Sequence, residues 1–220
     1  MRCSTLNCII PVPVSVKENG EKLSFTALES IYSSSADSSD EVEKLVSFFS
    51  FTGKKLAASD SKKDFQIIFT DDTALGKEEW KIIVDSKNIQ ILSGGKAGFS
   101  YAAEAVIQMA FAALREGPST AYFDGGEISD SPRFAYRGFM LDPSRHFQDK
   151  ATVLKAIKLL AAFRINTMHW HLADNQSWRM PSSTVPEITG KGTLTDGAYT
   201  REDIKEIVSI LVVICRKTNI

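Results

Sequence analysis

The sequence predicts two regions of different fold class: an α+β domain, in which helices cover one side of a sheet, and then the start of a parallel α/β sheet. Up to about residue 131 the expected elements follow the order β, α, several β, α, β, which is typical of an antiparallel-rich sheet in an α+β layer. After Pro132 the order becomes strand, loop, helix, strand, loop, helix, which indicates parallel strands joined by helices. We therefore expect domains over residues 1–131 and 132–220.

In the first region each element has a local signal. Pro11 and Pro13 lack the N–H that a central strand needs, so residues 9–16 are expected to form an edge strand. Ser38 and Glu41 form a capping-box pattern ahead of a helix with one apolar face. The other expected elements are a helix over 100–117, strands at 22–33, at 64–70 and from residue 121, and a hairpin over 80–94 that turns at 85–88.

In the second region the apolar pattern alternates between strand and helix periods. The expected elements are, in order, a short and almost wholly apolar strand over 136–142, a helix over 150–164, a second strand over 165–174 and a long loop over 175–199. Thr200 then opens a final helix, with Asp203 at the capping-box position.

The totals exclude several classes of protein. Of the 220 residues, 43% are hydrophobic and 24% are charged, which is ordinary for a globular chain with a buried core. The net charge of −1 comes without blocks of like charge, so we expect no nucleic acid as a partner. No apolar run approaches the roughly 20 residues of a membrane span. Pro11 and Pro13 interrupt the apolar patch near the start, so no signal peptide is expected, and the localisation is left undetermined.

Polar residues follow each strand of the second region where that strand is expected to end. The first strand is followed by Asp142, Ser144, Arg145 and His146, and the second by Asp174, Asn175, Gln176, Trp178 and Arg179. An arginine supplies forked donors, carboxylates accept hydroxyl protons, and an indole packs on the apolar face of a sugar ring. These residue types together favour a sugar site. For Trp178 and Arg179, packing within the loop is an equally good interpretation.

Two stretches carry a resemblance to a known family. "RFAYRGFMLDPSRHF" (133–147) and "NTMHWHLADNQSWR" (166–179) resemble the first two barrel strands of glycoside hydrolase family 20, the β-N-acetylhexosaminidases. The family patterns are roughly R-G-x-x-L-D-x-S-R-H-[FY] and, at a matching spacing, H-x-H-L-x-D-[DN]. "IIPVPVSV" (9–16) resembles the opening of that family's small α+β domain. The resemblance implies that residues 132–220 are the first βα units of a (β/α)₈ TIM barrel.

The resemblance also implies residue roles. Arg145 resembles the residue that binds the hydroxyls on carbons 3 and 4 of the terminal sugar, and Asp174 resembles one that supports the catalytic acid. The family's catalytic Asp-Glu pair has no counterpart here, so the chain is expected to be truncated before that pair and inactive alone. Asn175 and Ser177 replace an acid and a glycine of the bacterial pattern D-D-Q-G-W.

The activity implied is the removal of terminal non-reducing N-acetylglucosamine or N-acetylgalactosamine by substrate-assisted, retaining catalysis. No cofactor and no metal are expected. The partners would be glycans that contain N-acetylhexosamine, in chitin oligosaccharides, glycoproteins or mucins.

Other interpretations of the same residues stay open. His169 and His171 share one face of a strand, a spacing that would suit a metal-dependent barrel hydrolase, although packing inside the barrel is favoured. Arg145 could instead form a structural ion pair with Asp142, and Asp174 could cap the loop that follows it. A non-catalytic carbohydrate-binding remnant is the remaining alternative.

Overall fold

The computed structural model describes residues 4–189, 197–214 and 217–219. The chain divides into two compact units, of which the first ends at Arg133 and the second begins at Phe134. Each unit has its own sheet and its own hydrophobic core.

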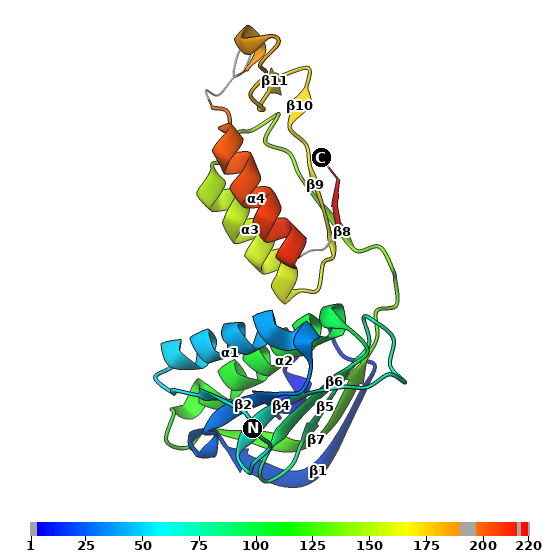
Figure 1. The fold of residues 1–220 in the computed structure, drawn as a ribbon, viewed down its shortest axis with the longest axis vertical. Helices are drawn as coiled ribbons and strands as arrows, with labels where there is room; N and C mark the ends of the chain where they lie inside the picture. The colour runs from blue at the N-terminus through cyan, green and yellow to red at the C-terminus, as the bar shows by residue number, and fades with distance from the viewer. Residues whose placement is uncertain (1–3, 190–196, 215–216, 220) are drawn as a thin grey trace. The chain divides into compact units, whose positions relative to one another are not determined.

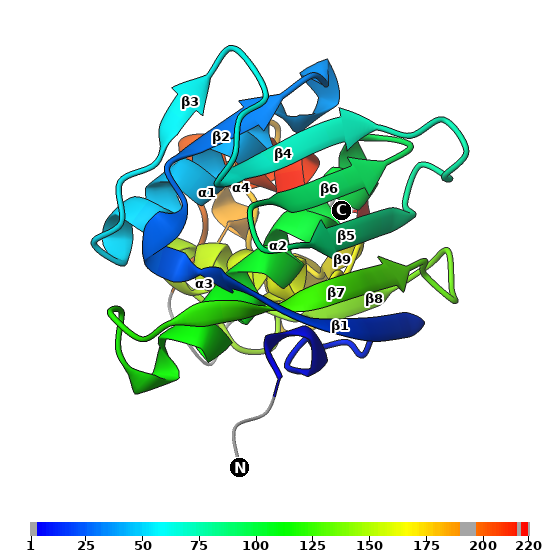
Figure 2. The same cartoon turned by 90° about the horizontal axis from the view of Figure 1, so that it is seen from below.

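The first unit contains seven strands and two α-helices (Figures 1 and 2). The strands are β1 (Ser15–Ser24), β2 (Ser30–Ser33), β3 (Ala57–Ser59), β4 (Gln66–Asp71), β5 (Trp80–Val84), β6 (Ile89–Ser93) and β7 (Tyr122–Asp130). The helices are α1 (Ser39–Phe51) and α2 (Lys96–Ala113), with short 3₁₀ helices at Thr5–Asn7, Phe25–Ala27, Ala36–Ser38 and Leu114–Glu116.

The seven strands form one mixed sheet in the order β1-β7-β5-β6-β4-β2-β3. Three neighbouring pairs are antiparallel: β1–β7, β7–β5 and β5–β6, of which the last is the predicted hairpin. The other three pairs are parallel: β6–β4, β4–β2 and β2–β3. The prediction of an antiparallel-rich sheet was therefore wrong for half of it. Helix α1 connects β2 to β3, and a helical connection of this kind returns the chain in the same direction.

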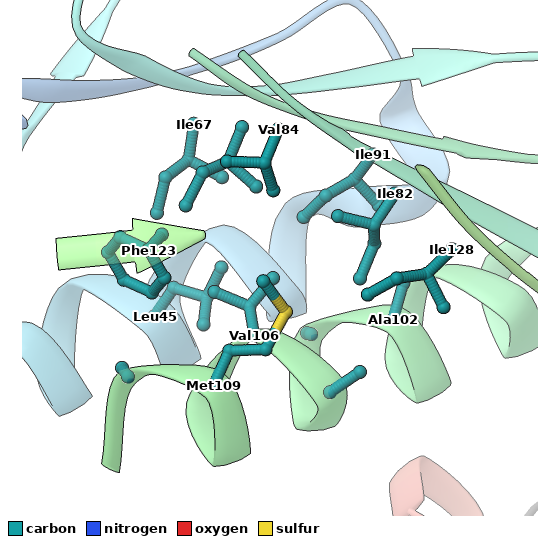
Figure 3. Packing of buried hydrophobic residues seen from close by; sticks show 14 of the residues in the cluster. Leu45, Ile67, Ile82, Val84, Ile91, Ala102, Val106, Met109, Phe123 and Ile128 are labelled. Carbon is teal, nitrogen blue, oxygen red and sulfur yellow. The ribbon is translucent and has the colours of Figure 1, made fainter. Parts of the chain in front are cut away.

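The core of the first unit lies between one face of this sheet and the two helices (Figures 1 and 3). In β5 and β6 every second residue is buried, which is the period of a strand with one face covered. Figure 3 shows Ile82 and Ile91 pointing from these strands toward Val106 and Met109 of α2. All four of these side chains are fully buried.

The edge strand begins later than its prolines suggested. β1 is an edge strand, but it starts at Ser15, after the two prolines, and runs to Ser24. Ahead of β1, the side-chain amide of Gln108 bonds to the backbone of Ile10. Its Oε1 accepts from the Ile10 N–H at 2.7 Å, and its Nε2 donates to the Ile10 carbonyl at 2.9 Å. The backbone of Ile10 is thus satisfied without a ladder.

The start of α1 also departs from the prediction. Ser38 is the N-cap residue, but its hydroxyl bonds to the Ser33 hydroxyl at 2.7 Å and to the Ser35 carbonyl at 3.1 Å instead of capping the helix. Glu41, the expected partner in the capping box, is only 3% exposed, and among the described residues its Oε2 accepts no hydrogen bond. Burial raises the pKa of Glu41 above the ordinary 4.5, although Lys44 opposes the shift.

The second unit is built on three parallel strands in the order β8-β9-β12. Its elements are β8 (Gly138–Leu141), α3 (Lys150–Ala162), β9 (Thr167–Trp170), β10 (Ala173–Asp174), β11 (Ser177–Trp178), a 3₁₀ helix (Pro186–Ile188), α4 (Arg201–Ile214) and β12 (Lys217–Asn219). The predicted loop over 175–199 is thus interrupted by β11 and by the 3₁₀ helix, and its residues 190–196 lie outside the described part of the chain.

Helices α3 and α4 lie side by side and pack on the same face of these strands (Figure 1). Met168 and Trp170 of β9 point to that face and join a small core with Val153 and Ile157 of α3 and Ile207 of α4. No helix in the described ranges is long and apolar enough to cross a bilayer.

The capping box predicted for α4 is confirmed. The Asp203 N–H donates to the Thr200 hydroxyl at 3.0 Å, and the Thr200 N–H donates to Asp203 Oδ2 at 3.0 Å. Lys150, at the start of α3, lies 3.0 Å from both Asp203 and Glu206. The backbone N–H of Thr200 and then Lys150 hold the pKa of Asp203 at about 2.

Candidate sugar-binding site

The candidate site lies at the carboxyl ends of β8 and β9, where these two strands leave the sheet. The His171 N–H donates to the Leu141 carbonyl at 2.9 Å, and the Ser144 N–H donates to the His171 carbonyl at 3.2 Å. These bonds continue the pairing of the two strands past their ends. They bring together two polar segments that are far apart in the sequence, and the β10–β11 hairpin follows directly after β9 (Figure 1).

Arg145 is the centre of this cluster. Its Nη1 lies 2.5 Å from Asp142 Oδ2, and its Nη2 lies 2.5 Å from Asp174 Oδ2. The backbone N–H of Arg145 also donates to Asp142 Oδ1 at 3.0 Å. The ion pair with Asp142 that the sequence allowed is therefore present, but Asp174 takes the other arm of the guanidinium. The Arg145 side chain is still 54% exposed, so part of it faces solvent.

Asp174 collects donors from three directions. Besides Arg145, it accepts from the Asn175 N–H at 2.6 Å and lies 3.0 Å from His171 Nε2. The bond from Asn175 first, and then His171 and Arg145, lower the pKa of Asp174. The Arg145 backbone N–H and guanidinium likewise lower the pKa of Asp142, although burial opposes this shift. Both carboxyls are therefore held as anions around one cation.

The two histidines differ from each other. His171 is half-buried and bonded to Asp174, whereas His169 is exposed, with its ring centroid 5.7 Å from that of His171. His169 lies on the sheet face opposite the one that α3 and α4 cover, which is the face that would become the interior of a complete barrel, so the expectation that both histidines pack inside the barrel stays a prediction. Among the described residues no group of three or more His, Cys, Asp or Glu side chains could hold a metal ion.

The loop residues under the site are buried. Arg179 is fully buried, and its guanidinium donates to the carbonyls of Pro143 at 2.9 Å and Gly197 at 2.6 Å. Of the two interpretations of Arg179, packing within the loop is the one observed. Sequence reasoning missed the pairing of Ser144 with Ser177, since the two lie 33 residues apart and no local pattern connects them.

Comparison with known families matches nearly the whole described chain. The profile of the glycosyl hydrolase family 20 catalytic domain matches residues 134–210, and the profile of domain 2 of the same family matches residues 7–131.

Individual relatives agree with these matches. A β-hexosaminidase of Porphyromonas gingivalis is 36% identical over 152 residues, which are 62% of this chain and 19% of that protein. The β-hexosaminidase subunit alpha of Bos taurus is 38% identical over 96 residues, which are 43% of this chain and 18% of that protein. The chain thus spans about a fifth of the length of these curated relatives.

Solved structures show the same likeness. Streptomyces plicatus N-acetyl-β-hexosaminidase in complex with Thio-NAglucal has a TM-score of 0.84 at 25% identity, covering 98% of this chain and 45% of that one. A GH20 exo-β-N-acetylglucosaminidase from Vibrio harveyi in complex with N-acetylglucosamine has a TM-score of 0.83 at 25% identity, covering 98% of this chain and 36% of that one.

Proposed function

This chain belongs to glycosyl hydrolase family 20, and on that premise we propose that it provides the N-terminal domain (1–131) and the first part of the catalytic barrel (132–220) of a β-N-acetylhexosaminidase. That enzyme would remove terminal N-acetylglucosamine or N-acetylgalactosamine from chitin oligosaccharides, glycoproteins or mucin-type glycans. The relatives named β-hexosaminidase support this proposal, as does the related structure that contains N-acetylglucosamine.

The topology of the second unit supports the start of a (β/α)₈ barrel. Its strands lie in the sheet in the same order as in the chain, β8, β9 and β12, and both connecting helices pack on one face. A barrel grows in this way, by adding each parallel strand on the same side with its helix outside. A doubly wound sheet would place helices on both faces.

The observation that carries the proposal is the position of Arg145. Two carboxylates hold its guanidinium at the carboxyl ends of the strands, which is where barrel enzymes form their active sites. A guanidinium has five N–H donors in a fixed fork, and the two pairs with Asp142 and Asp174 do not exhaust them. The rest can donate to neighbouring hydroxyls of a sugar, as the family resemblance implies for the hydroxyls on carbons 3 and 4.

The role proposed for Asp174 is to support the catalytic acid. In substrate-assisted catalysis the acetamido oxygen of the sugar attacks the anomeric carbon, so one carboxylic acid protonates the leaving group and a second carboxylate orients the acetamido group. Neither member of that Asp-Glu pair is found at a matching place in these 220 residues. Asp174, bonded to His171 and Arg145, would keep a fixed negative charge beside the acid.

Hydrolysis of two matched substrates tests the proposal. A protein that carries this chain with the rest of the catalytic domain should hydrolyse an aryl N-acetyl-β-glucosaminide. It should leave the aryl β-glucoside, which lacks the acetamido nucleophile, nearly untouched. The 220-residue chain alone should hydrolyse neither, since the general acid by itself is worth about 10²–10⁴-fold. Equal rates on the two glycosides would contradict the assignment.

A chelator separates the proposal from metal-dependent hydrolysis. EDTA should leave the rate of the active protein unchanged. If EDTA abolished activity and zinc restored it, His169 and His171 would be ligands and the metal-dependent alternative would replace the proposal.

A further inference from the structure

Three polar side chains are buried directly beneath the candidate site. Ser144 and Arg179 are fully buried, and Ser177 is 5% exposed. Burying polar groups is costly unless they are hydrogen-bonded, and a charge costs most of all. Their hydrogen bonds therefore identify the segments of the chain that are connected beneath this site. We call Ser144, Ser177 and Arg179 the latch.

The two serines bond to each other's backbone. The Ser144 hydroxyl donates to the Ser177 carbonyl at 2.9 Å, and the Ser177 hydroxyl donates to the Ser144 carbonyl at 2.7 Å. This reciprocal pair connects the segment after β8 to β11 of the β10–β11 hairpin. A glycine at position 177, as in the bacterial family pattern, would supply the carbonyl but not the hydroxyl.

Arg179 adds hydrogen bonds to the same segment after β8. Its Nε donates to the Pro143 carbonyl at 2.9 Å and its Nη2 to the Ser144 carbonyl at 3.3 Å, while Nη1 donates to the Gly197 carbonyl at 2.6 Å. The guanidinium also lies 5.3 Å from the centre of the Phe147 ring. The three bonds leave three different nitrogens of one planar group, whereas a lysine would present all its donors from a single nitrogen.

The latch acts on the two backbones that carry the exposed ion pair. Pro143 and Ser144 directly precede Arg145, and Ser177 is the strand partner of Asp174 in the hairpin. Arg145 is half-exposed, and an exposed ion pair is by itself worth little. We propose that Ser144, Ser177 and Arg179 are positioning residues, which fix the loop of Arg145 against the hairpin of Asp174. The consequence for sugar binding rests on the function proposed above, whereas the consequence for the ion pair does not.

The test uses the full 220-residue chain with Ser177→Ala, which removes one hydroxyl and keeps the Cβ. The matched control is Ser182→Ala, because the Ser182 hydroxyl accepts from the Val185 N–H at 3.0 Å, a bond within the loop that follows β11. Hydrogen exchange is followed at the amides of Ser144 and Arg179, which bond to His171 and Leu172. The titration of Asp174 is followed by NMR with ¹³C-labelled aspartate.

In Ser177→Ala the two amides should exchange about fivefold faster, the effect of losing one neutral hydrogen bond. The pKa of Asp174 should move up toward its ordinary value as Arg145 loosens. Arg179→Lys should produce larger changes in the same direction, and Ser182→Ala none. The proposal is overturned if Ser177→Ala behaves like the control. It is equally overturned if exchange accelerates uniformly through α3 while the Asp174 titration stays in place, because the serine would then support only the fold.

Activity separates this inference from the proposed function. In an active protein with the rest of the catalytic domain, Ser177→Ala should raise KM for the N-acetylglucosaminide more than it lowers kcat, since Arg145 is proposed to bind the sugar. If the wild type hydrolyses no N-acetylglucosaminide, the proposed function fails, while the shifts in exchange and Asp174 titration still support the latch. If the wild type is active and the variant keeps its KM, exchange and titration, the latch fails.

Discussion

The two units solve the problem of stability in different ways. The first packs seven strands against two helices around one large apolar core, whereas the second has a three-stranded parallel sheet, the β10–β11 hairpin, two helices and a much smaller core. The second unit adds two polar features to its small core, the buried latch and the capping box of α4. We therefore expect the first unit to supply most of the stability, whereas the second contains the candidate sugar-binding site.

The carboxyls whose pKa values shift also differ between the two units. In the first unit, burial raises the pKa of Glu41, so the fold works against that charge. In the second, nearby donors lower the pKa values of Asp142, Asp149, Asp174 and Asp203, so the fold favours those charges. Acid should therefore act in opposite directions on these two sets of carboxyls.

The largest expected effect is the difference in thermal stability between the two units when they are separated. A fragment of residues 4–133 is expected to melt cooperatively, near the upper transition of the whole chain, because its core is complete. A fragment of residues 134–220 should melt lower and more broadly, since three strands with open edges bury little apolar surface. Circular dichroism melts with dye binding measure this. A second unit that melted alone as high and as sharply as the first would break the comparison.

Core truncations should affect one unit at a time. Ile82→Ala in β5 should cost the first unit about 2–5 kcal/mol, because a fully buried side chain leaves a cavity. Ile157→Ala in α3, equally buried, should lower only the transition of the second unit. Calorimetry of the whole chain would resolve both changes. If either substitution shifted the two transitions together, the units would not be independent.

Catalysis should respond to the second unit alone. In a protein with the complete catalytic domain, Arg145→Lys keeps the charge but loses the fork. The kcat/KM for an N-acetylglucosaminide should therefore fall about 10- to 100-fold, the effect of one charge-assisted hydrogen bond. The loss should shrink for substrates without the 3- or 4-hydroxyl, because the partner is then absent in both enzymes. Arg133→Lys, outside the site, is the control; an equal loss there would remove the special role of Arg145.

Sequence patterns predicted most local features of both units, although the Ser38–Glu41 capping box of α1 was wrong. The β5–β6 hairpin and the Thr200–Asp203 capping box are confirmed, because each depends on residues close together in the chain. The prediction that the edge strand starts at residue 9 was wrong. The backbone of Ile10 bonds to the side-chain amide of Gln108, 98 residues away, and not to a neighbouring strand. No local signal reports a partner at that distance.

The candidate site shows the same division. Arg145 and Asp174 were singled out by their place after two strands and by the family pattern, and their roles stay predictions. Their ion pair, which spans 29 residues, follows from the parallel register of β8 and β9. The latch could not have been predicted, since it depends on how a hairpin folds back on a loop.

The smallest predicted effect compares the two kinds of carboxyl by pH. Glu41 has a folded pKa above 4.5, so the unfolded chain releases its proton first as pH rises, and the first unit loses stability through that window. Glu41→Gln should therefore raise the melting temperature of the first unit at pH 7, with a difference that vanishes near pH 4. Glu43→Gln, on the exposed side of the same helix, should change nothing.

Asp203 should show the opposite sign. Its folded pKa of about 2 lies below the ordinary 3.8, so the stability it contributes is complete above 3.8 and disappears as pH falls through 2. Asp203→Asn should lower the melting temperature of the second unit at pH 7, and the difference from the wild type should close at about pH 2. Thermal melts of both variants across this pH range decide the matter. If both variants raised the melting temperature at pH 7, or both lowered it, the contrast between the two units would rest on core size alone and not on how each fold treats its charges.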